Sequence, residues 1–421
     1  SLFLLIDMKN ILEKSFHFLL PLLFIFPLFK ESISSAFFIG LSINTVIHSI
    51  VTKSYKNFNY QNLYYCIPFF IVFVFISFDF FSKGNLKQLN RALFFLLFPI
   101  IFSLIPKSYF AKEKLDFYFT LLKNSCLIIA VGFIIAFLWT YDFADFFVYK
   151  YGIPKFRDFV YYEINFFIIH PTYYTAIVVF CTAYSFEKVL NEKKYWEILY
   201  VFSFVLITFL VLAKINIVYM AILFVIMLLF RSSFSITQKI ASVLAFALIG
   251  ASLISFIPGV KKRFTEMVVS YKNPPKGLAF DSTNIRLSIS ECSYEIAKEN
   301  YLFGVGFENL PKELNKCFAK NYDSSFYKNH QYLTHNYFFF IFLSTGLIGL
   351  LALLFYWYKV FRIALKINSF LLYVVTINVV LISCTEDFFI RHYGIFYFNL
   401  ILMTFINFYQ NQKLLENKKS F

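Results

Sequence analysis

The sequence is poor in charged residues. Only 15% of its 421 residues are Asp, Glu, Lys or Arg, whereas 59% are hydrophobic and the mean hydropathy is +0.67. A soluble domain of this length would keep about a quarter of its residues charged. The composition therefore excludes an ordinary soluble fold and indicates a protein embedded in a membrane.

The sequence also lacks the motifs that hold common cofactors. Gly304-Val305-Gly306 follows no predicted strand and completes no GxGxxG pattern, so neither a dinucleotide site nor a P-loop is predicted. The six cysteines show no Cys/His spacing typical of zinc, and the acidic residues of the external segments form no metal cage. We therefore expect no cofactor and no metal ion.

Acidic residues are outnumbered, with 24 Asp and Glu against 39 Lys and Arg, which gives a net charge of +15. In a soluble protein this excess would suggest nucleic acid binding. In a membrane protein it more often reflects basic loops that fix the orientation of the chain. We therefore expect contacts with membrane lipids and no nucleic acid partner.

The apolar residues are concentrated in blocks of about 16 to 24, long enough to cross about 30 Å of hydrocarbon as helices. The predicted fold is an all-α polytopic membrane protein with about twelve transmembrane helices and one large external loop that contains short helices. The predicted spans are residues 15–29, 35–52, 62–81, 92–106, 117–139, 171–187, 196–213, 215–230, 239–257, 335–357, 367–385 and 393–409.

The short loops predict the orientation. With both termini inside, the inner loops hold roughly twice as many Lys and Arg residues as the outer ones, as the positive-inside rule requires. The outer Lys83, Lys87 and Arg91 are the local exception. We therefore predict cytoplasmic termini and an external loop at 258–334, between the ninth and tenth spans.

Residues 8–421 are predicted to form a single membrane domain. Met8-Lys9 is a plausible native start, so residues 1–7 are given no structural role. A smaller external segment is predicted at 140–170, which is too polar to cross the membrane.

The large loop contains two predicted amphipathic helices. The first, over 282–299, places Arg286 beside its apolar stripe, where the side chain can point at a ligand. The stripe consists of Ile285, Ile289, Cys292 and Ile296. The second helix, over 311–321, turns Leu314, Cys317 and Phe318 inward. Cys292 and Cys317 can form a disulfide in an oxidising compartment, or remain two buried thiols.

Four motifs occur in a recognisable order between about residues 160 and 400. They are HPTYYTAIVV from His170, FLVLAKINIVYMA around Lys214, NIRLSISECSYEIAKENYLFGVGF with Arg286, Gly304 and Gly306, and HNYFFFIFLSTGLIGL from His335. This order resembles the O-antigen ligase and polymerase superfamily, which are membrane transferases that use polyprenyl-diphosphate-linked glycans. The family usually has Ser-Arg where Ala213-Lys214 stand, and Lys keeps the charge but loses the bidentate fork.

The resemblance implies an inverting, metal-independent glycan transfer at the external face. Arg286 and Lys214 would neutralise the leaving diphosphate, and His335 would accept the proton of the attacking sugar hydroxyl. Glu386 would hold the other imidazole nitrogen, unless it pairs with Arg391. Supporting positions would be Asn336, Gly304, Gly306 and His170.

Each of these residues also has a simpler interpretation. His335 at the start of a helix can be an interfacial or capping residue, and Arg286 can be a solvated charge. Lys214 can extend its ammonium to the membrane surface without touching a substrate. His170, which precedes Pro171, can be a helix-start residue.

The expected function is glycan transfer in the bacterial cytoplasmic (inner) membrane. Lipid A-core is the first choice of acceptor, because one external loop is much larger than the other. A growing glycan, as in a repeat-unit polymerase, and a protein are the alternatives. A transporter of polyprenyl-linked glycans is the non-enzyme alternative, although it predicts charges in the middle of spans, where the sequence has few.

Overall fold

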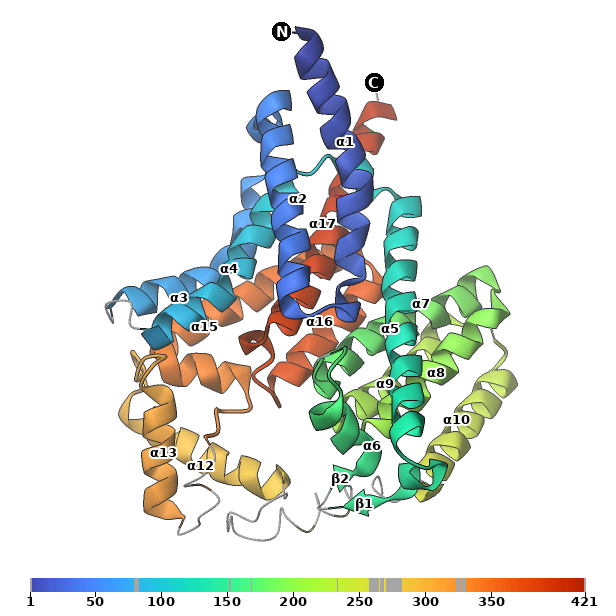
Figure 1. The fold of residues 1–421 in the computed structure, drawn as a ribbon, viewed down its shortest axis with the longest axis vertical. Helices are drawn as coiled ribbons and strands as arrows, with labels where there is room; N and C mark the ends of the chain where they lie inside the picture. The colour runs from blue at the N-terminus through green and yellow to red at the C-terminus, as the bar shows by residue number, and fades with distance from the viewer. Residues whose placement is uncertain are drawn as a thin grey trace.

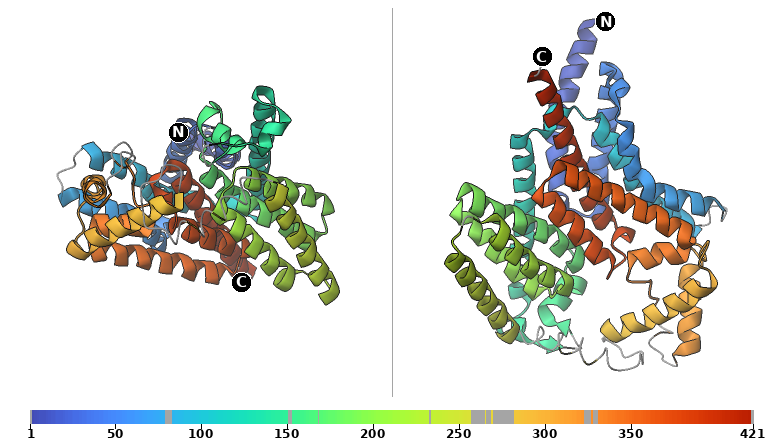
Figure 2. Two further views of the ribbon diagram at one scale, coloured as in Figure 1. Left: turned by 90° about the horizontal axis from the view of Figure 1, so that it is seen from below. Right: turned by 180° about the vertical axis from the view of Figure 1, so that it is seen from behind.

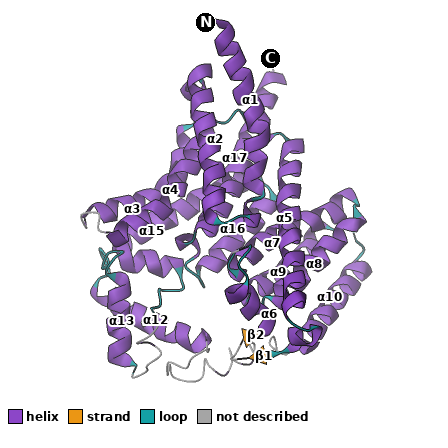
Figure 3. Ribbon diagram, viewed as in Figure 1, coloured by secondary structure: helices purple, strands orange, loops and turns teal. Residues whose placement is uncertain are grey.

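The computed structural model describes residues 2–78, 83–150, 153–167, 169–232, 234–256, 282–322 and 331–419, with single positions 265, 269 and 327. These residues are helical apart from loops and one short ladder between β1 (Tyr149–Lys150) and β2 (Ile153–Pro154), as Figure 3 shows. The predicted all-helical class is confirmed. Parts of the predicted spans 62–81 and 239–257, and much of the predicted loop 258–334, lie outside the described residues.

Each of the twelve predicted spans overlaps a helix, with edges that differ by several residues. The helices are α1 (Leu2–Phe24), α2 (Glu31–Thr52), α3 (Ile67–Phe78, preceded by the turn η3, Tyr60–Cys66), α4 (Lys83–Leu104), α5 (Lys112–Thr140), α7 (Pro171–Glu192), α8 (Ile198–Leu210), α9 (Lys214–Ile226), α10 (Ile236–Phe256), α15 (Tyr337–Ile367), α16 (Phe370–Ser383) and α17 (His392–Lys419).

Six segments of the described chain are long and apolar enough to cross a membrane. They are Glu31–Thr52, Tyr60–Ser77, Gly84–Leu104, Lys112–Thr140, Lys214–Arg231 and Tyr337–Ile367. Tyr195–Leu210, Ile236–Ser252 and Phe370–Ser383 are shorter apolar helices. The protein is therefore a helical membrane protein.

Two helices form the centre of the bundle. Residues 171–186 of α7 and 393–407 of α17 are buried on every side, which is expected of a helix that other helices surround. Figures 1 and 2 show α3, α4 and α15 on one side of this centre and α8, α9 and α10 on the other. Both termini lie at one end of the molecule, and α12 (Ser282–Glu299) and α13 (Leu310–Asn321) lie at the opposite end.

The tenth predicted span differs from the structure in length. It was expected to end at Trp357, with Lys359, Arg362 and Lys366 in the loop that follows. Instead α15 continues to Ile367 and ends at Asn368, which adopts a left-handed conformation with φ 51°. The three cations are tolerated because no Gly or Pro lies between Trp357 and Asn368, and the predicted loop was wrong.

The same helix is broken at Gly346, where the sequence predicted continuous helix. Gly346 has φ 68° and ψ −165°, outside the helical region, and Figure 1 draws α15 as two segments that meet at a bend. A Cβ atom at this position would lie 2.0 Å from the carbonyl oxygen of Leu302. The break exists because another part of the chain occupies the space beside it.

That other part is the turn at Gly304 and Gly306. The amides of Val305 and Gly306 donate to the carbonyls of Leu343 and Ser344, at 2.8 and 3.0 Å. In return, the amide of Leu347 donates to the carbonyl of Tyr301 at 2.7 Å. Gly304 has φ 70°, and a Cβ there would lie 2.5 Å from the Leu343 oxygen. The turn thus satisfies carbonyls that the break would otherwise leave unpaired, and it fixes the external helices on α15.

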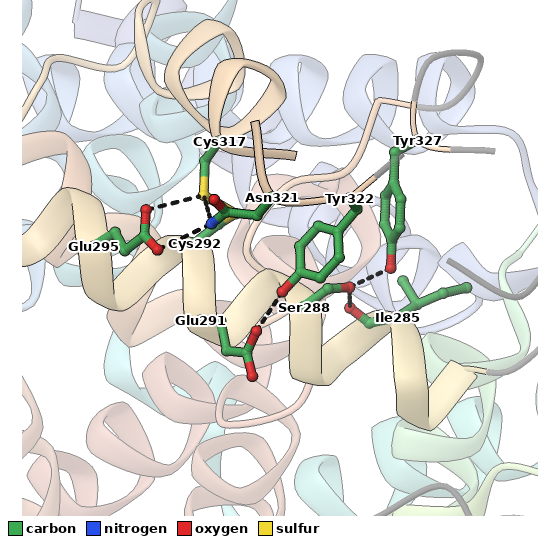
Figure 4. The surroundings of a disulfide bond; sticks show 9 residues. All are labelled: Ile285, Ser288, Glu291, Cys292, Glu295, Cys317, Asn321, Tyr322 and Tyr327. Atoms are coloured by element: carbon green, nitrogen blue, oxygen red, sulfur yellow. Dashed lines mark hydrogen bonds between the residues drawn. A yellow bond between two sulfur atoms is a disulfide. The ribbon is translucent and has the colours of Figure 1, made fainter. Parts of the chain in front are cut away.

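The two external helices pack as the sequence predicts. The stripe Ile285, Ile289, Cys292 and Ile296 is buried, and so are Leu314, Cys317 and Phe318 of α13. A disulfide joins Cys292 to Cys317 with an S–S distance of 2.02 Å (Figure 4). Asn321 of α13 also donates to the Glu295 carboxylate at 2.9 Å. Arg286 therefore lies on a helix that is joined to α13 by the disulfide and to α15 through the turn at Gly304.

Candidate active site

His335 lies two residues before the start of α15. Its φ of 44° is unusual for a residue other than glycine, although His, Asn and Asp adopt it more often than most. The side chain is about one-third exposed, at 34%. The imidazole is therefore accessible, and a left-handed backbone position fixes its direction.

Glu386 connects His335 to Arg286. It lies between α16 and the short turn η9 (Phe388–Ile390). One carboxylate oxygen pairs with Arg286 Nη2 at 2.7 Å, and the other lies 3.1 Å from His335 Nδ1. A single carboxylate thus joins an arginine from the external loop to a histidine at the start of α15.

The charge state of Glu386 follows from these neighbours. Burial alone would raise the pKa of the carboxyl, but the hydrogen bond from His335 and the charge of Arg286 lower it to about 2. The carboxylate is therefore ionised at physiological pH and can only accept hydrogen bonds. Nδ1 of His335 must carry the proton that it shares with Glu386, which leaves Nε2 as the basic nitrogen.

Asp387 holds the backbone around His335. Its Oδ2 accepts from the His335 amide at 3.0 Å, and its Oδ1 accepts from the Asn336 amide at 3.2 Å and from Thr334 Oγ1 at 2.6 Å. Burial raises the pKa of this carboxyl, and the hydrogen bonds from Thr334 and His335 oppose that change. These three bonds keep His335 in its left-handed conformation, so Asp387 acts through His335 as a positioning residue.

We predict that Asp387→Asn lowers kcat of the reaction at this site on the order of 100-fold. This is the loss typical of a misplaced catalytic group. The asparagine NH₂ group would face an amide donor, so one of the three bonds is lost and the His335 backbone moves. The measurement is kcat against KM in membrane vesicles, with Asp116→Asn on α5 as the control. An unchanged kcat in Asp387→Asn would refute the positioning role.

Asn336 caps α15. Its side-chain oxygen accepts from the amides of Phe338 and Phe339, at 3.0 and 3.1 Å. This satisfies two of the amides that a helix N-terminus leaves unpaired. The residue therefore begins the helix that follows His335, and its contacts are with the backbone rather than with the imidazole.

His170 also caps a helix. Its Nδ1 accepts from the Thr172 amide at 3.2 Å, at the start of α7. Burial lowers its pKa to about 3, so the ring is neutral. Glu386 and His335 are among the groups whose charges influence this pKa, so His170 lies close to them. The helix-start interpretation describes its contacts better than a reactive role.

Lys214 is the first residue of α9, at the corner between the predicted spans 196–213 and 215–230. Leu212 turns the chain there with φ 51°, and Arg157 donates to the carbonyls of Val211 and Leu212, at 2.8 and 2.6 Å. Arg157 in turn influences the pKa of His170. Arg157 therefore holds the chain just before Lys214 and lies near His170.

Sequence reasoning missed two sets of residues at the site. Asp387 is adjacent to the predicted Glu386, but nothing in one sequence shows that its partner is the backbone 52 positions earlier. Tyr161 and Tyr332 were also missed, although their rings lie 4.8 Å from His170 and 6.1 Å from His335. The only feature of the sequence that could have indicated them is that a tyrosine occurs near each histidine.

The arrangement can perform acid–base chemistry next to an anion. An imidazole with a free Nε2 accepts a proton, and the ionised Glu386 stabilises the imidazolium that results. A guanidinium has five N–H donors, so Arg286 can bind Glu386 and an anionic ligand together. No group of three or more His, Cys, Asp or Glu side chains able to hold a metal occurs in the described part of the chain.

Two comparisons with known proteins bear on this site. A family model described as O-antigen ligase matches residues 175–354. The matched range includes Lys214, Arg286 and His335, whereas His170 and Glu386 lie just outside it. No curated protein matches the chain.

Proposed function

Because residues 175–354 belong to the O-antigen ligase family, we propose that this chain transfers a glycan from a polyprenyl diphosphate carrier to an acceptor hydroxyl. The observation that carries the proposal is the bridge through Glu386, which places a proton acceptor and a cation on the two oxygens of one carboxylate. Glycan transfer from a diphosphate needs both groups together.

The proposed reaction is a single displacement at the anomeric carbon. The acceptor hydroxyl attacks this carbon and passes its proton to Nε2 of His335. The bond between the anomeric carbon and the diphosphate oxygen breaks, and the diphosphate leaves with the electron pair. Arg286 binds the leaving anion, and a direct displacement of this kind inverts the anomeric configuration. Lys214 supplies a second cation in the proposal.

The arrangement of the helices supports a site on the external face of the bacterial inner membrane. We propose that the twelve helices that coincide with the predicted spans all cross the membrane, with both termini in the cytoplasm. The termini share one end of the molecule, and α12 and α13 lie at the other (Figure 1). His335, two residues before α15, shares the Glu386 carboxylate with Arg286 of the external helix α12.

For the acceptor we propose the lipid A-core, which would make the chain an O-antigen ligase. The dominance of one external loop, 258–334, favours this acceptor. The alternative is a repeat-unit polymerase, favoured by the ordered second segment. There the turn η5 (Phe143–Phe147), the β1–β2 ladder and the short helix α6 (Lys155–Asp158) precede the site.

Deletion of the gene tests the function and separates the acceptors. We expect lipopolysaccharide with undecorated core and accumulation of carrier-linked glycan in the membrane. Core capped with single repeat units would instead indicate a polymerase, and normal glycan with unmodified glycoproteins a protein transferase. Carrier-linked glycan confined to the cytoplasmic leaflet would indicate a transporter. Normal surface glycans and glycoproteins without accumulated carrier would refute glycan transfer altogether.

A further inference from the structure

Three tyrosines lie near the two histidines of the candidate active site. Tyr161 and Tyr162 lie on the π-helical turn η6 (Phe159–Glu163), and Tyr332 lies three residues before His335. Tyr161 is 39% exposed and Tyr162 is 67% exposed, whereas Tyr332 is half-buried. The turn η6, which is remote in sequence from His335, thus carries two exposed tyrosine rings.

The rings of these tyrosines form two groups, one on each of the two histidines. Tyr162 contacts Tyr161 edge-on at 4.3 Å, and Tyr161 contacts His170 edge-on at 4.8 Å. From the other side, the ring centre of Tyr332 lies 6.1 Å from that of His335. Burial raises the pKa of Tyr332 to about 12, and Tyr327 and Tyr162 add to the change. Tyr162 and Tyr332 are therefore electrostatic neighbours. The two sides are also joined through Tyr173, whose ring centre lies 5.6 Å from that of His170 and whose hydroxyl donates to the Asp387 carbonyl at 3.4 Å.

The turn that carries Tyr161 and Tyr162 is held at both ends. Glu163, its last residue, accepts a hydrogen bond from the Tyr141 hydroxyl at 2.8 Å. Arg157, two residues before the turn, donates to the carbonyls of Val211 and Leu212 at the end of α8. The exposure of the two rings is therefore a fixed feature of the surface.

Exposed tyrosines in a membrane protein usually belong to the interfacial aromatic belt. The exposed Phe143 and Phe147 of η5 fit that explanation. Tyr161 does not, because its ring contacts His170, beside Glu386 and His335. Single π-helical turns are rare, and they occur frequently at functional sites. The position of the pair thus points to a ligand rather than to lipid.

We propose that Tyr161, Tyr162 and Tyr332 form a platform on which sugar rings of the glycan stack. The proposal rests on the function proposed above and names the part of the substrate that these residues recognise. Pyranose rings present C–H bonds on one face, which suit the negative face of an aromatic ring, and the tyrosine hydroxyls can bond the sugar hydroxyls. The platform would hold the glycan while Arg286 holds the diphosphate.

The test compares Tyr162→Ala with Tyr162→Phe in purified protein. The donor is carrier-linked glycan extracted from the deletion strain. We expect Tyr162→Ala to raise the donor KM about 10-fold, while Tyr162→Phe stays within about twofold because the ring face remains. Inhibition by polyprenyl diphosphate without sugar should be unchanged in both. A rise confined to the acceptor KM would place the acceptor sugar, instead of the donor sugar, on the platform.

Two further measurements make the result decisive. Tyr294→Ala removes a tyrosine of similar exposure, 70%, from α12 and should leave every constant unchanged. Saturation-transfer NMR with the oligosaccharide released from the donor by mild acid measures sugar binding even if no transfer is detected. Equal sugar signals in wild type and Tyr162→Ala would overturn the platform alone. Weaker binding of polyprenyl diphosphate in Tyr162→Ala would also overturn it.

Discussion

His335→Asn is expected to abolish glycan transfer while the protein folds and inserts normally. Removing a general base lowers the rate about 10²- to 10⁴-fold, and Asn has no group that can accept the hydroxyl proton. Asn is the suitable replacement because it tolerates the left-handed backbone that His335 adopts, with φ 44°. The measurements are surface glycan in complemented deletion cells and kcat with purified donor and acceptor.

Two controls isolate the role of the imidazole. His17→Ala removes an exposed histidine from α1 and should leave transfer unchanged. His335→Asn itself should keep its affinity for polyprenyl diphosphate, because Arg286 and Glu386 remain. Wild-type surface glycan in His335→Asn cells would rule out His335 as the base.

Much of the fold could be predicted from the sequence, because each span is recognised from the apolar composition of its own residues. The stripe of Ile289 and Cys292 in α12 also follows from helical spacing alone, and both residues are buried as predicted. The corner before Lys214 was predicted from a lysine between two apolar runs. These features depend on neighbours in sequence, and such features can be predicted from one chain.

The break of α15 at Gly346 could not be predicted in this way. Locally, residues 337–357 form a mostly apolar run without a charged residue, and an isolated glycine inside a helix is usually tolerated. The break depends on the turn at Gly304, some 40 residues earlier, which donates to the carbonyls of Leu343 and Ser344. Only the tertiary contact shows that the turn at Gly304 and the break at Gly346 depend on each other.

The candidate site divides in the same way. Arg286 and His335 were predicted from motifs. They are linked through Glu386, which is 100 positions from the arginine in the sequence. The sequence offered pairing with Arg391 as the simpler interpretation of Glu386. The structure places Glu386 on His335 and Arg286, because the segment after α16 turns toward the start of α15. Contacts between residues so far apart in the sequence cannot be predicted from helical periodicity.

Arg286→Ala is expected to lower transfer on the order of 10²- to 10³-fold, as when a donor that stabilises a developing anion is removed. Unlike His335→Asn, it should also weaken the binding of polyprenyl diphosphate. Arg286→Lys should be intermediate, since a lysine keeps the charge but loses the planar fork. The measurements are kcat, the donor KM and the inhibition constant of polyprenyl diphosphate.

Arg231 supplies a matched control for this prediction. It pairs with Glu187 at 2.6 Å and its side chain is 43% exposed, against 2.7 Å and 43% for Arg286 with Glu386. Arg231→Ala therefore breaks an ion pair of the same geometry away from the site. In both pairs the arginine is well exposed, and ion pairs at the surface contribute at most about 1 kcal/mol to stability, so both variants should fold. If Arg286→Ala and Arg231→Ala retain equal transfer, Arg286 is only a solvated ion-pair partner. If Arg286→Ala alone loses polyprenyl diphosphate binding, the guanidinium binds the carrier.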